Sequence, residues 1–158
     1  MKIIIGSDHA GFDYKEKLKP WLEENFSGCK IEDLGPNRYN PTDDYPVYSF
    51  AVAEKTARSK DAAGIIIAKS GIGEVVAANK VRGVRAVSFM GRANRKYLQM
   101  SRIHDDTNVL CFGSDFVSLR AAKKAIKIWL GTKFEKGARH VRRLKEVSDY
   151  EKRNWKSG

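Results

Sequence analysis

The sequence has few cysteines and no long apolar run, and these two shortages exclude several kinds of protein. Only Cys29 and Cys111 occur among its 158 residues, and there is no Cys-x-x-Cys pair or cluster of cysteine and histidine. A structural zinc site is therefore excluded, and we expect both thiols to be buried in strands. No stretch approaches the roughly 18 apolar residues that cross a bilayer, and the first residues lack the features of a signal peptide. We expect a cytoplasmic domain that does not enter a membrane.

Acidic residues are also scarce. The chain has 19 Asp and Glu and 30 Lys and Arg, which gives a net charge of +11. Repeats and long linkers are missing as well, so we expect one domain over residues 1–158. Its last segment, 133–158, holds nine basic and four acidic residues and is expected to be a helical extension. Nucleic acid, an anionic membrane surface and a phosphorylated small molecule all suit this charge, and charge alone does not choose among them.

Short apolar runs alternate along the chain with longer amphipathic ones, which is the pattern of strands alternating with helices. We expect strands at 2–6, 29–34, 64–68, 84–89 and 108–112, and helices at 12–25, 46–59, 75–80, 92–103, 116–130 and 138–155. In the helix 92–103, the residues expected to face the core are Ala93, Tyr97, Leu98 and Met100. This order predicts an α/β fold, a Rossmann-like three-layer sandwich in which a five-stranded parallel sheet carries helices on both faces and a basic helix follows.

Ligands of such sheets bind beyond the carboxyl ends of the strands, so the residues near strand ends are the candidate site. Asp8 and His9 follow the first strand, 69–74 follows the third, and His104 and Asp105 lie between the fourth helix and the fifth strand. We expect the three groups to converge at one edge of the sheet. Taken singly, an aspartate here serves as a helix cap and an isolated histidine is more often structural.

The segment Ser70-Gly71-Ile72-Gly73 joins a strand to a helix, where backbone N–H groups form a cradle for a phosphate or an oxyanion. The alternative is a tight turn without a ligand. Glu74 follows inside the turn. It is either a base beside this cradle or a carboxylate that complements the helix dipole.

Arg139 and Arg143 are one helical turn apart in a basic cluster and are candidates to bind one phosphate together. The alternative is a solvated basic face. Aromatic residues are sparse around this cluster, and recognised nucleic-acid-binding motifs are absent. We therefore expect a phosphorylated small molecule as the partner, with neither nucleic acid nor a membrane bound.

Several motifs together resemble those of ribose-5-phosphate isomerase type B, whose wider family includes galactose-6-phosphate and allose-6-phosphate isomerases. They are GSDHAGF (6–12), DDYP (43–46), SGIGE (70–74), AANK (77–80), RGVRA (82–86), SRIHDDTNVLCFGS (101–114) and ARHVRR (138–143). The resemblance implies an aldose–ketose isomerase that acts on ribose 5-phosphate and ribulose 5-phosphate through a cis-enediolate. It also implies no metal and no cofactor, and a homodimer or tetramer whose site lies at a subunit interface.

The resemblance assigns a role to each candidate residue. Glu74 is the base, in a chain that has Ala68 where other members carry a catalytic cysteine, and His104 opens the furanose ring. Asp8 and Ser70 assist the chemistry. The substrate is bound by His9, by the anion hole formed by Lys69, Gly71, Ile72 and Gly73 with Ser70, by Asp105, and by the phosphate ligands Arg139 and Arg143.

Three residues depart from the family pattern, namely Lys69, Asp105 and Asp115, which replaces an arginine that commonly helps to bind phosphate. We expect Lys69 to pair with Asp115 or to contact the anionic end of the substrate. The alternative is that Asp115 points to solvent and Lys69 has no role in the site. The departures leave two alternatives open: a non-catalytic sugar-phosphate-binding paralogue, and an isomerase of a hexose 6-phosphate. The C-terminal helix is expected to cross to a partner subunit, with Leu144, Val147, Tyr150 and Trp155 as its apolar anchors.

Overall fold

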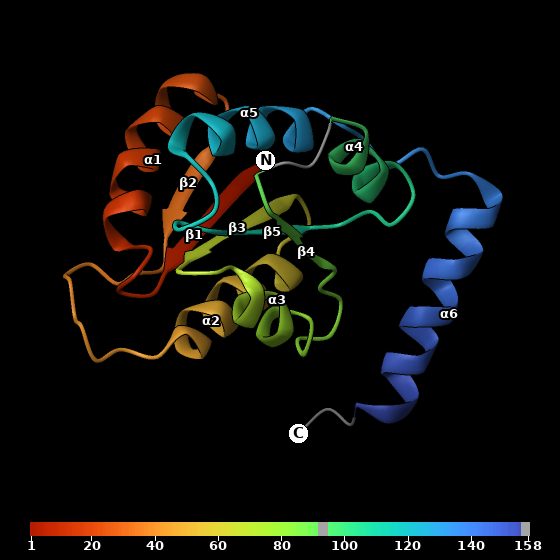
Figure 1. The fold of residues 1–158 in the computed structure, drawn as a ribbon. Coiled ribbons are helices and arrows are strands. Elements are labelled where there is room, and N and C mark those ends of the chain that lie inside the picture. Colours follow the sequence, from red (N-terminus) through yellow and green to blue (C-terminus); the bar gives the residue numbers. More distant parts are fainter. Residues whose placement is uncertain (92–94, 156–158) are drawn as a thin grey trace.

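The computed structural model describes residues 1–91 and 95–155 and contains five strands and six helices in these ranges (Figure 1). The strands are β1 (Lys2–Ser7), β2 (Lys30–Asp33), β3 (Ala62–Ala68), β4 (Ala86–Phe89) and β5 (Val109–Gly113). The helices are α1 (Phe12–Asn25), α2 (Tyr45–Arg58), α3 (Ile72–Ala78), α4 (Arg95–Ile103), α5 (Leu119–Leu130) and α6 (Ala138–Asn154). Each strand alternates with a helix as the sequence predicted.

The strands form one parallel sheet in the order β2-β1-β3-β5-β4. Alternate side chains point to opposite faces of a strand, so Ile3 and Ile5 pack with α1, α4 and α5, whereas Ile4 packs with α2 and α3. The ribbon accordingly has α1, α4 and α5 on one side of the sheet and α2 and α3 on the other (Figure 1). The predicted three-layer α/β fold is confirmed.

The chain changes direction between β1 and β3. From β1 it passes outward to β2, and it then returns through α2 to β3, on the other side of β1. In sheets of this kind a crevice opens at the carboxyl ends of the two central strands. The segments that leave β1 and β3 at this edge are Ser7–His9 and Lys69–Glu74. The topology therefore brings two of the three predicted groups together.

Some boundaries and orientations differ from the sequence prediction. Helix α5 begins only at Leu119 because the N–H groups of residues 116 and 117 both donate to the carbonyl of Gly113, which forms a turn before the helix. In α4, Leu98 is buried as predicted, but Tyr97 and Met100 are exposed, which corrects the expected inward orientation. The predicted position of Ala93 lies outside the described residues.

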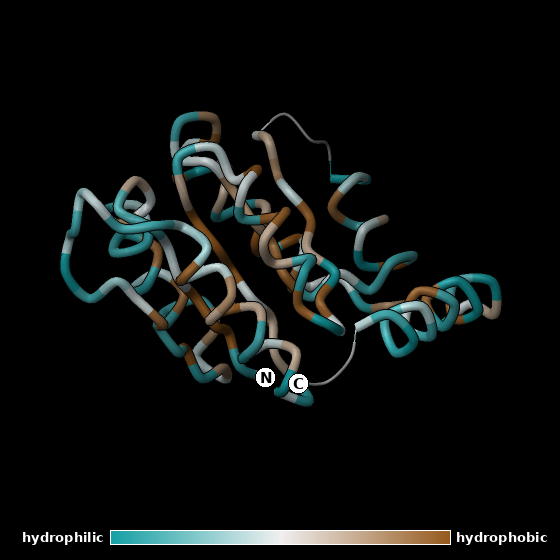
Figure 2. The backbone as a smooth tube through the Cα atoms, turned by 90° about the horizontal axis from the view of Figure 1, so that it is seen from below, coloured by the Kyte–Doolittle hydropathy of each residue, from teal (hydrophilic) through white to brown (hydrophobic). Residues whose placement is uncertain are grey.

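Helix α6 stands beside the sheet without packing tightly against it (Figures 1 and 2). None of its residues is buried, and Glu151 Oε2 accepts a hydrogen bond from the N–H of Gly83 at 3.1 Å. No helix within residues 1–91 and 95–155 is both long and apolar enough to cross a membrane.

Candidate functional site

Three buried side-chain oxygens lack a hydrogen-bond partner in the part of the chain that the structure describes. They are Ser7 Oγ, Asp43 Oδ2 and Glu74 Oε2. Ser7 ends β1, Glu74 lies in the first turn of α3, and Asp43 precedes α2. Leaving a buried polar atom unpaired costs about 1–3 kcal/mol, so such atoms point to a missing partner. Their occurrence at the carboxyl edge of the sheet marks this edge as a ligand site.

Glu74 and Asp8 place two carboxyl groups in this site. Glu74 is only 4% exposed, and burial raises its pKa, with a further increase from the negative charge of Asp8. Burial also raises the pKa of Asp8, although the N–H of Gly11 donates to its Oδ1 at 3.0 Å. A carboxylate that only complemented a helix dipole would remain hydrated. The burial of Glu74 thus suits a proton acceptor whose pKa lies nearer neutral pH.

Close packing accounts for the glycines of the loop between β3 and α3. Gly71 has a positive φ of 77°, and a Cβ on it would lie 2.7 Å from the carbonyl carbon of Phe112. A Cβ on Gly73 would lie 2.7 Å from the ring of Tyr45. Ser70 Oγ accepts a hydrogen bond from the N–H of Ile72 at 3.3 Å. The tight-turn alternative is thus sufficient to explain these glycines, and the role of the loop as an anion hole stays a prediction.

His9 is bound by a carboxylate that lies 34 positions further along the chain. Asp43 Oδ1 accepts the backbone N–H of His9 at 2.9 Å and lies 2.7 Å from its ring nitrogen Nδ1. The hydrogen bond to Asp43 raises the pKa of His9. Burial raises the pKa of Tyr48, and its side-chain interaction with Asp43 raises it further.

His104 does not join these residues within one chain, which corrects the predicted convergence at one edge. Helix α4 starts after the carboxyl end of β4 and runs back, so the residues that follow its end lie at the amino edge of the sheet. The N–H of Asn108 donates to the carbonyl of Arg85, just before β4 begins. Asp8, in contrast, donates its N–H to Ile67 near the end of β3. His104 lies in the loop that precedes β5, whereas Asp8 and Lys69 lie in loops that follow strands.

A second group of candidate residues surrounds His104 at the amino edge. Its ring stacks on that of His140, with centroids 4.3 Å apart and planes inclined by 5°. Burial lowers the pKa of His140, and the positive charges of His104, Arg139 and Arg143 lower it further, whereas Asp105 opposes them. All five side chains are therefore neighbours, and the cluster has an excess of cationic groups that suits an anion.

Two of the departures from the family pattern, Lys69 and Asp115, do not form the expected ion pair. The N–H of Asp115 donates to the backbone carbonyl of Lys69 at 3.2 Å, but both side chains are exposed. No ion pair between these two side chains occurs in the described structure. The predicted pairing of Lys69 with Asp115 is wrong for the single chain, because the strand ends bring their backbones together while the side chains point to solvent.

Asp43, Tyr48 and His140 belong to the two clusters but were not predicted from the sequence as site residues. Asp43 lies in the DDYP motif, which contributes to the family resemblance. The spacing of this motif does not indicate which side chain Asp43 contacts. The ARHVRR segment drew attention to its arginines, although its histidine makes the ring contact.

Comparison with known proteins gives matches over most of the chain. The family model for ribose/galactose isomerases matches residues 3–147. Ribose-5-phosphate isomerase B of Escherichia coli is 40% identical over 153 residues, which are 96% of this chain and 97% of that protein. D-erythrulose-4-phosphate isomerase 2 of Mycolicibacterium smegmatis is 37% identical over 152 residues, which are 96% of this chain and 97% of that protein. The crystal structure of ribose-5-phosphate isomerase B from Mycoplasma genitalium with bound ribulose-5-phosphate has a TM-score of 0.86 at 38% identity and covers 96% of both chains.

Proposed function

Because the chain belongs to the ribose/galactose isomerase family, we propose that it interconverts ribose 5-phosphate and ribulose 5-phosphate through a cis-enediolate, with Glu74 as the base. The resemblance stated from the sequence motifs is confirmed as to family. The observation that carries the proposal is the buried, unpartnered Oε2 of Glu74 beside Asp8.

Glu74 takes the proton from C2 of the open-chain aldose and returns it to C1. This step needs a base whose pKa is near the working pH, and burial moves the pKa of Glu74 in that direction. Negative charge develops on the carbonyl oxygen during the transfer and needs hydrogen-bond donors. Ser70 and the backbone of Lys69, Gly71, Ile72 and Gly73 supply them. Asp8, whose pKa burial also raises, donates a proton to O1 and takes up the proton that the O2 hydroxyl releases, so it ends the reaction in its starting protonation state.

The completed site requires a second copy of the chain. His104, Asp105, Arg139 and Arg143 are at the amino edge, and only a partner subunit can bring them to Glu74 at the carboxyl edge. Exposed apolar side chains beside the Glu74 site support a subunit contact there, with Val47 65%, Ile72 57% and Val76 57% exposed on α2 and α3. Contiguous exposed apolar residues are typical of protein interfaces.

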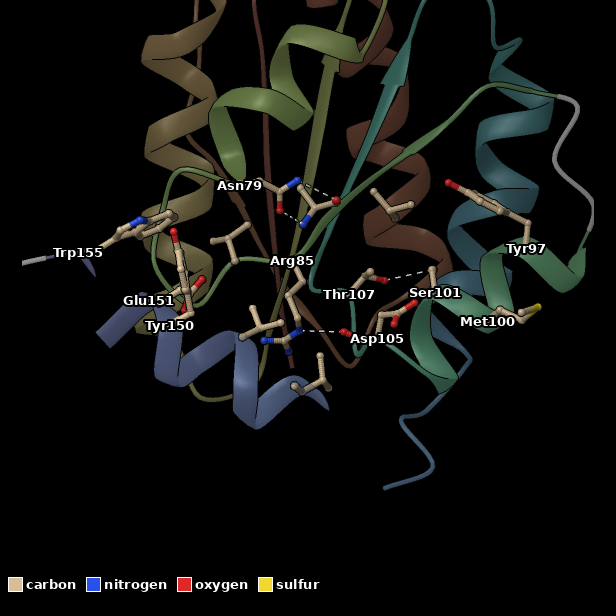
Figure 3. A pocket seen from close by; sticks show the side chains of 15 residues that line it. Asn79, Arg85, Tyr97, Met100, Ser101, Asp105, Thr107, Tyr150, Glu151 and Trp155 are labelled. Atoms are coloured by element: carbon tan, nitrogen blue, oxygen red, sulfur yellow. Dashed lines mark hydrogen bonds between the residues drawn. The ribbon is translucent and has the colours of Figure 1, made fainter. Parts of the chain in front are cut away.

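Helix α6 offers the complementary surface. Its side chains Val147 and Tyr150 are exposed, and they line a cavity of about 670 Å³ between the helix and β4 (Figure 3). Leu144 and Trp155 line the same cavity. These are the four anchors expected from the sequence. We therefore propose a homodimer, or a tetramer built from it, in which α6 of one subunit carries Arg139 and Arg143 to the site of the other.

A coupled assay on a panel of sugar phosphates tests the activity. We expect conversion of ribose 5-phosphate, and loss of that conversion in the Glu74→Gln variant, with the exposed Glu54→Gln as matched control. The similarity to a D-erythrulose-4-phosphate isomerase makes a four-carbon ketose phosphate the competing substrate. Faster turnover of that ketose phosphate, or of a hexose 6-phosphate, would reassign the substrate. Turnover of none of the three would indicate a non-catalytic paralogue.

The remaining expectations concern partners and location. The family supports a phosphorylated sugar as the partner, and we propose that neither nucleic acid nor a membrane is bound and that neither a metal nor a cofactor takes part. An enzyme for such a metabolite acts in the cytoplasm, as a single domain over residues 1–158 with its helical extension at 133–158.

A further inference from the structure

Asp43 is buried beside the candidate site, yet nothing in the reaction described above uses it. Its side chain is 6% exposed, whereas that of His9 is 35% exposed. One of its oxygens, Oδ1, binds both the main chain and the ring of His9, at 2.9 and 2.7 Å. A single acceptor that binds two donors of one residue fixes both the backbone position and the ring orientation of that residue.

The loop that carries Asp43 is itself ordered by specific contacts. At its start, the fully buried Lys15 donates from Nζ to the carbonyl of Pro36 at 3.0 Å and to Asp33 Oδ2 at 2.5 Å. Near its end, Asn40 Oδ1 accepts the N–H and hydroxyl of Thr42 at 3.2 and 2.9 Å. The loop therefore delivers the Asp43 carboxylate to a defined position.

The His9 ring is held on a second side by aromatic contact. Tyr39, from the same loop, meets the ring edge-on with centroids 6.5 Å apart, and it also meets Phe12 at 6.1 Å. The ring nitrogen Nε2 makes no hydrogen bond with any described residue. With Nδ1 turned inward to Asp43, Nε2 is left on the partly exposed side of the ring.

We propose that Asp43 is a positioning residue, which acts through His9 by holding the imidazole charged and with its Nε2–H directed at the anionic end or a hydroxyl of the sugar phosphate. The carboxylate fixes the ring as a charged donor because an ion pair in a partly desolvated site favours the protonated imidazole. This inference depends on the proposed function in one respect, namely that the ligand of His9 is a sugar phosphate. A histidine oriented in this way is a stronger binding group for phosphate than a freely rotating neutral one.

The ionisable groups around His9 come from three directions. Asp8 is adjacent in the chain, Asp43 and Tyr39 come from the loop before α2, and Glu74 lies beyond Asp8. Asp43 is the group in direct contact with the ring, so its removal should affect His9 most. This predicts that the titration of His9 depends chiefly on Asp43.

The titration of the histidines by NMR tests the proposal without relying on activity. The chain has three histidines, so each signal is assignable from His→Asn variants of the full-length protein. We expect Asp43→Asn to lower the titration midpoint of His9 and to leave the other two signals in place. The matched control is Asp44→Asn, which removes the same charge from the adjacent exposed residue whose side chain does not cap α2. We expect this control to leave all three signals unchanged.

Steady-state kinetics with ribose 5-phosphate give a second, separate readout. Loss of a charged hydrogen bond that forms equally in the ground and transition states raises KM about 10- to 100-fold and leaves kcat nearly unchanged. In a His9→Asn background, Asp43→Asn should add no further increase in KM, because Asp43 acts through His9.

Two results would overturn the inference: an unchanged His9 midpoint in Asp43→Asn, or an equal increase in KM whether or not His9 is present. If Asp43→Asn does not fold, the wild-type titration decides, since a His9 midpoint at or below the ordinary value of about 6.5 contradicts the proposal. Absence of isomerase activity in the wild type would reject the proposed function but would leave the NMR test of Asp43 valid.

Discussion

The imidazole rings of His104 and His140 lie parallel at 4.3 Å between centroids, although they belong to segments 36 positions apart. When one of two stacked imidazoles is protonated, its positive charge makes protonation of the other less favourable. Arg139 and Arg143 add to this repulsion, which lowers the pKa of His140 after the effect of burial. Burial and the three neighbouring positive charges thus all act in the same direction on the pKa of His140.

The first prediction concerns the coupling of these two rings. Removing His104 by substitution with Asn should raise the titration midpoint of His140, because one positive neighbour is lost. NMR titration of the assigned His140 signal measures the shift. An unmoved His140 midpoint would show that the rings do not interact in solution.

The second prediction separates ring opening from isomerisation. We expect His104→Asn to lose most of its turnover of ribose 5-phosphate, because proton transfer by a positioned group contributes about 10²–10⁴-fold. A four-carbon aldose 4-phosphate cannot close a furanose ring, since its O4 carries the phosphate. Any turnover of such a substrate should therefore fall much less in this variant. The ratio of the two rates is the measurement, and a parallel loss on both substrates would place His104 in the isomerisation step instead.

The third prediction concerns the cost of burying Glu74. The pKa of Glu74 is higher in the folded than in the unfolded chain. Between the unfolded pKa of about 4.3 and the folded pKa, the folded chain therefore keeps a proton that the unfolded chain has lost. The free energy of unfolding falls as pH rises through this interval. Glu74→Gln removes this decrease. Its melting temperature should exceed that of the wild type increasingly as pH rises from 4 to 7, by about 2–4 °C for each kcal/mol.

The measurement is a series of melting curves for both proteins across this range, with turnover measured in parallel. We expect turnover of ribose 5-phosphate to fall about 10²–10⁴-fold in the variant while KM changes little. A difference in melting temperature that does not depend on pH would mean that Glu74 is not held in a desolvated charged state.

The fourth prediction tests whether the site is shared between subunits. Glu74→Gln and Arg139→Ala should each be nearly inactive alone. When the two are co-expressed, one of the two sites in each mixed dimer carries neither change, because Glu74 and Arg139 of that site come from different chains. Random assembly into dimers of this symmetry then restores about a quarter of the wild-type activity. Mixing Glu74→Gln with itself under the same conditions is the control.

Failure of the mixture to recover activity, while native mass spectrometry detects mixed dimers, would place both residues in a site formed by one chain. Recovery far above a quarter would mean that one of the single variants was not inactive at its own site.

The sequence allowed the fold to be predicted almost in full, since β1 and β3 are continuous apolar runs and α4, α5 and α6 have clear amphipathic patterns. The family could be recognised from its motifs. The arrangement of the site could not be predicted, because the position of His104 relative to Glu74 depends on which end of a helix meets which edge of the sheet. The contact of Asp43 with His9 was also hidden, because the two residues are 34 positions apart and α1, β2 and a loop lie between them.

The placement of Glu74 and His104 at opposite edges of one sheet has a consequence for how activity depends on concentration. In the proposed dimer, no single chain brings both residues into one site, so the number of working sites follows the association equilibrium of the chain rather than its total amount. Specific activity should therefore fall on dilution below the dissociation constant of the dimer, and it should do so while each chain stays folded. The concentration of the protein therefore determines the rate of turnover per chain.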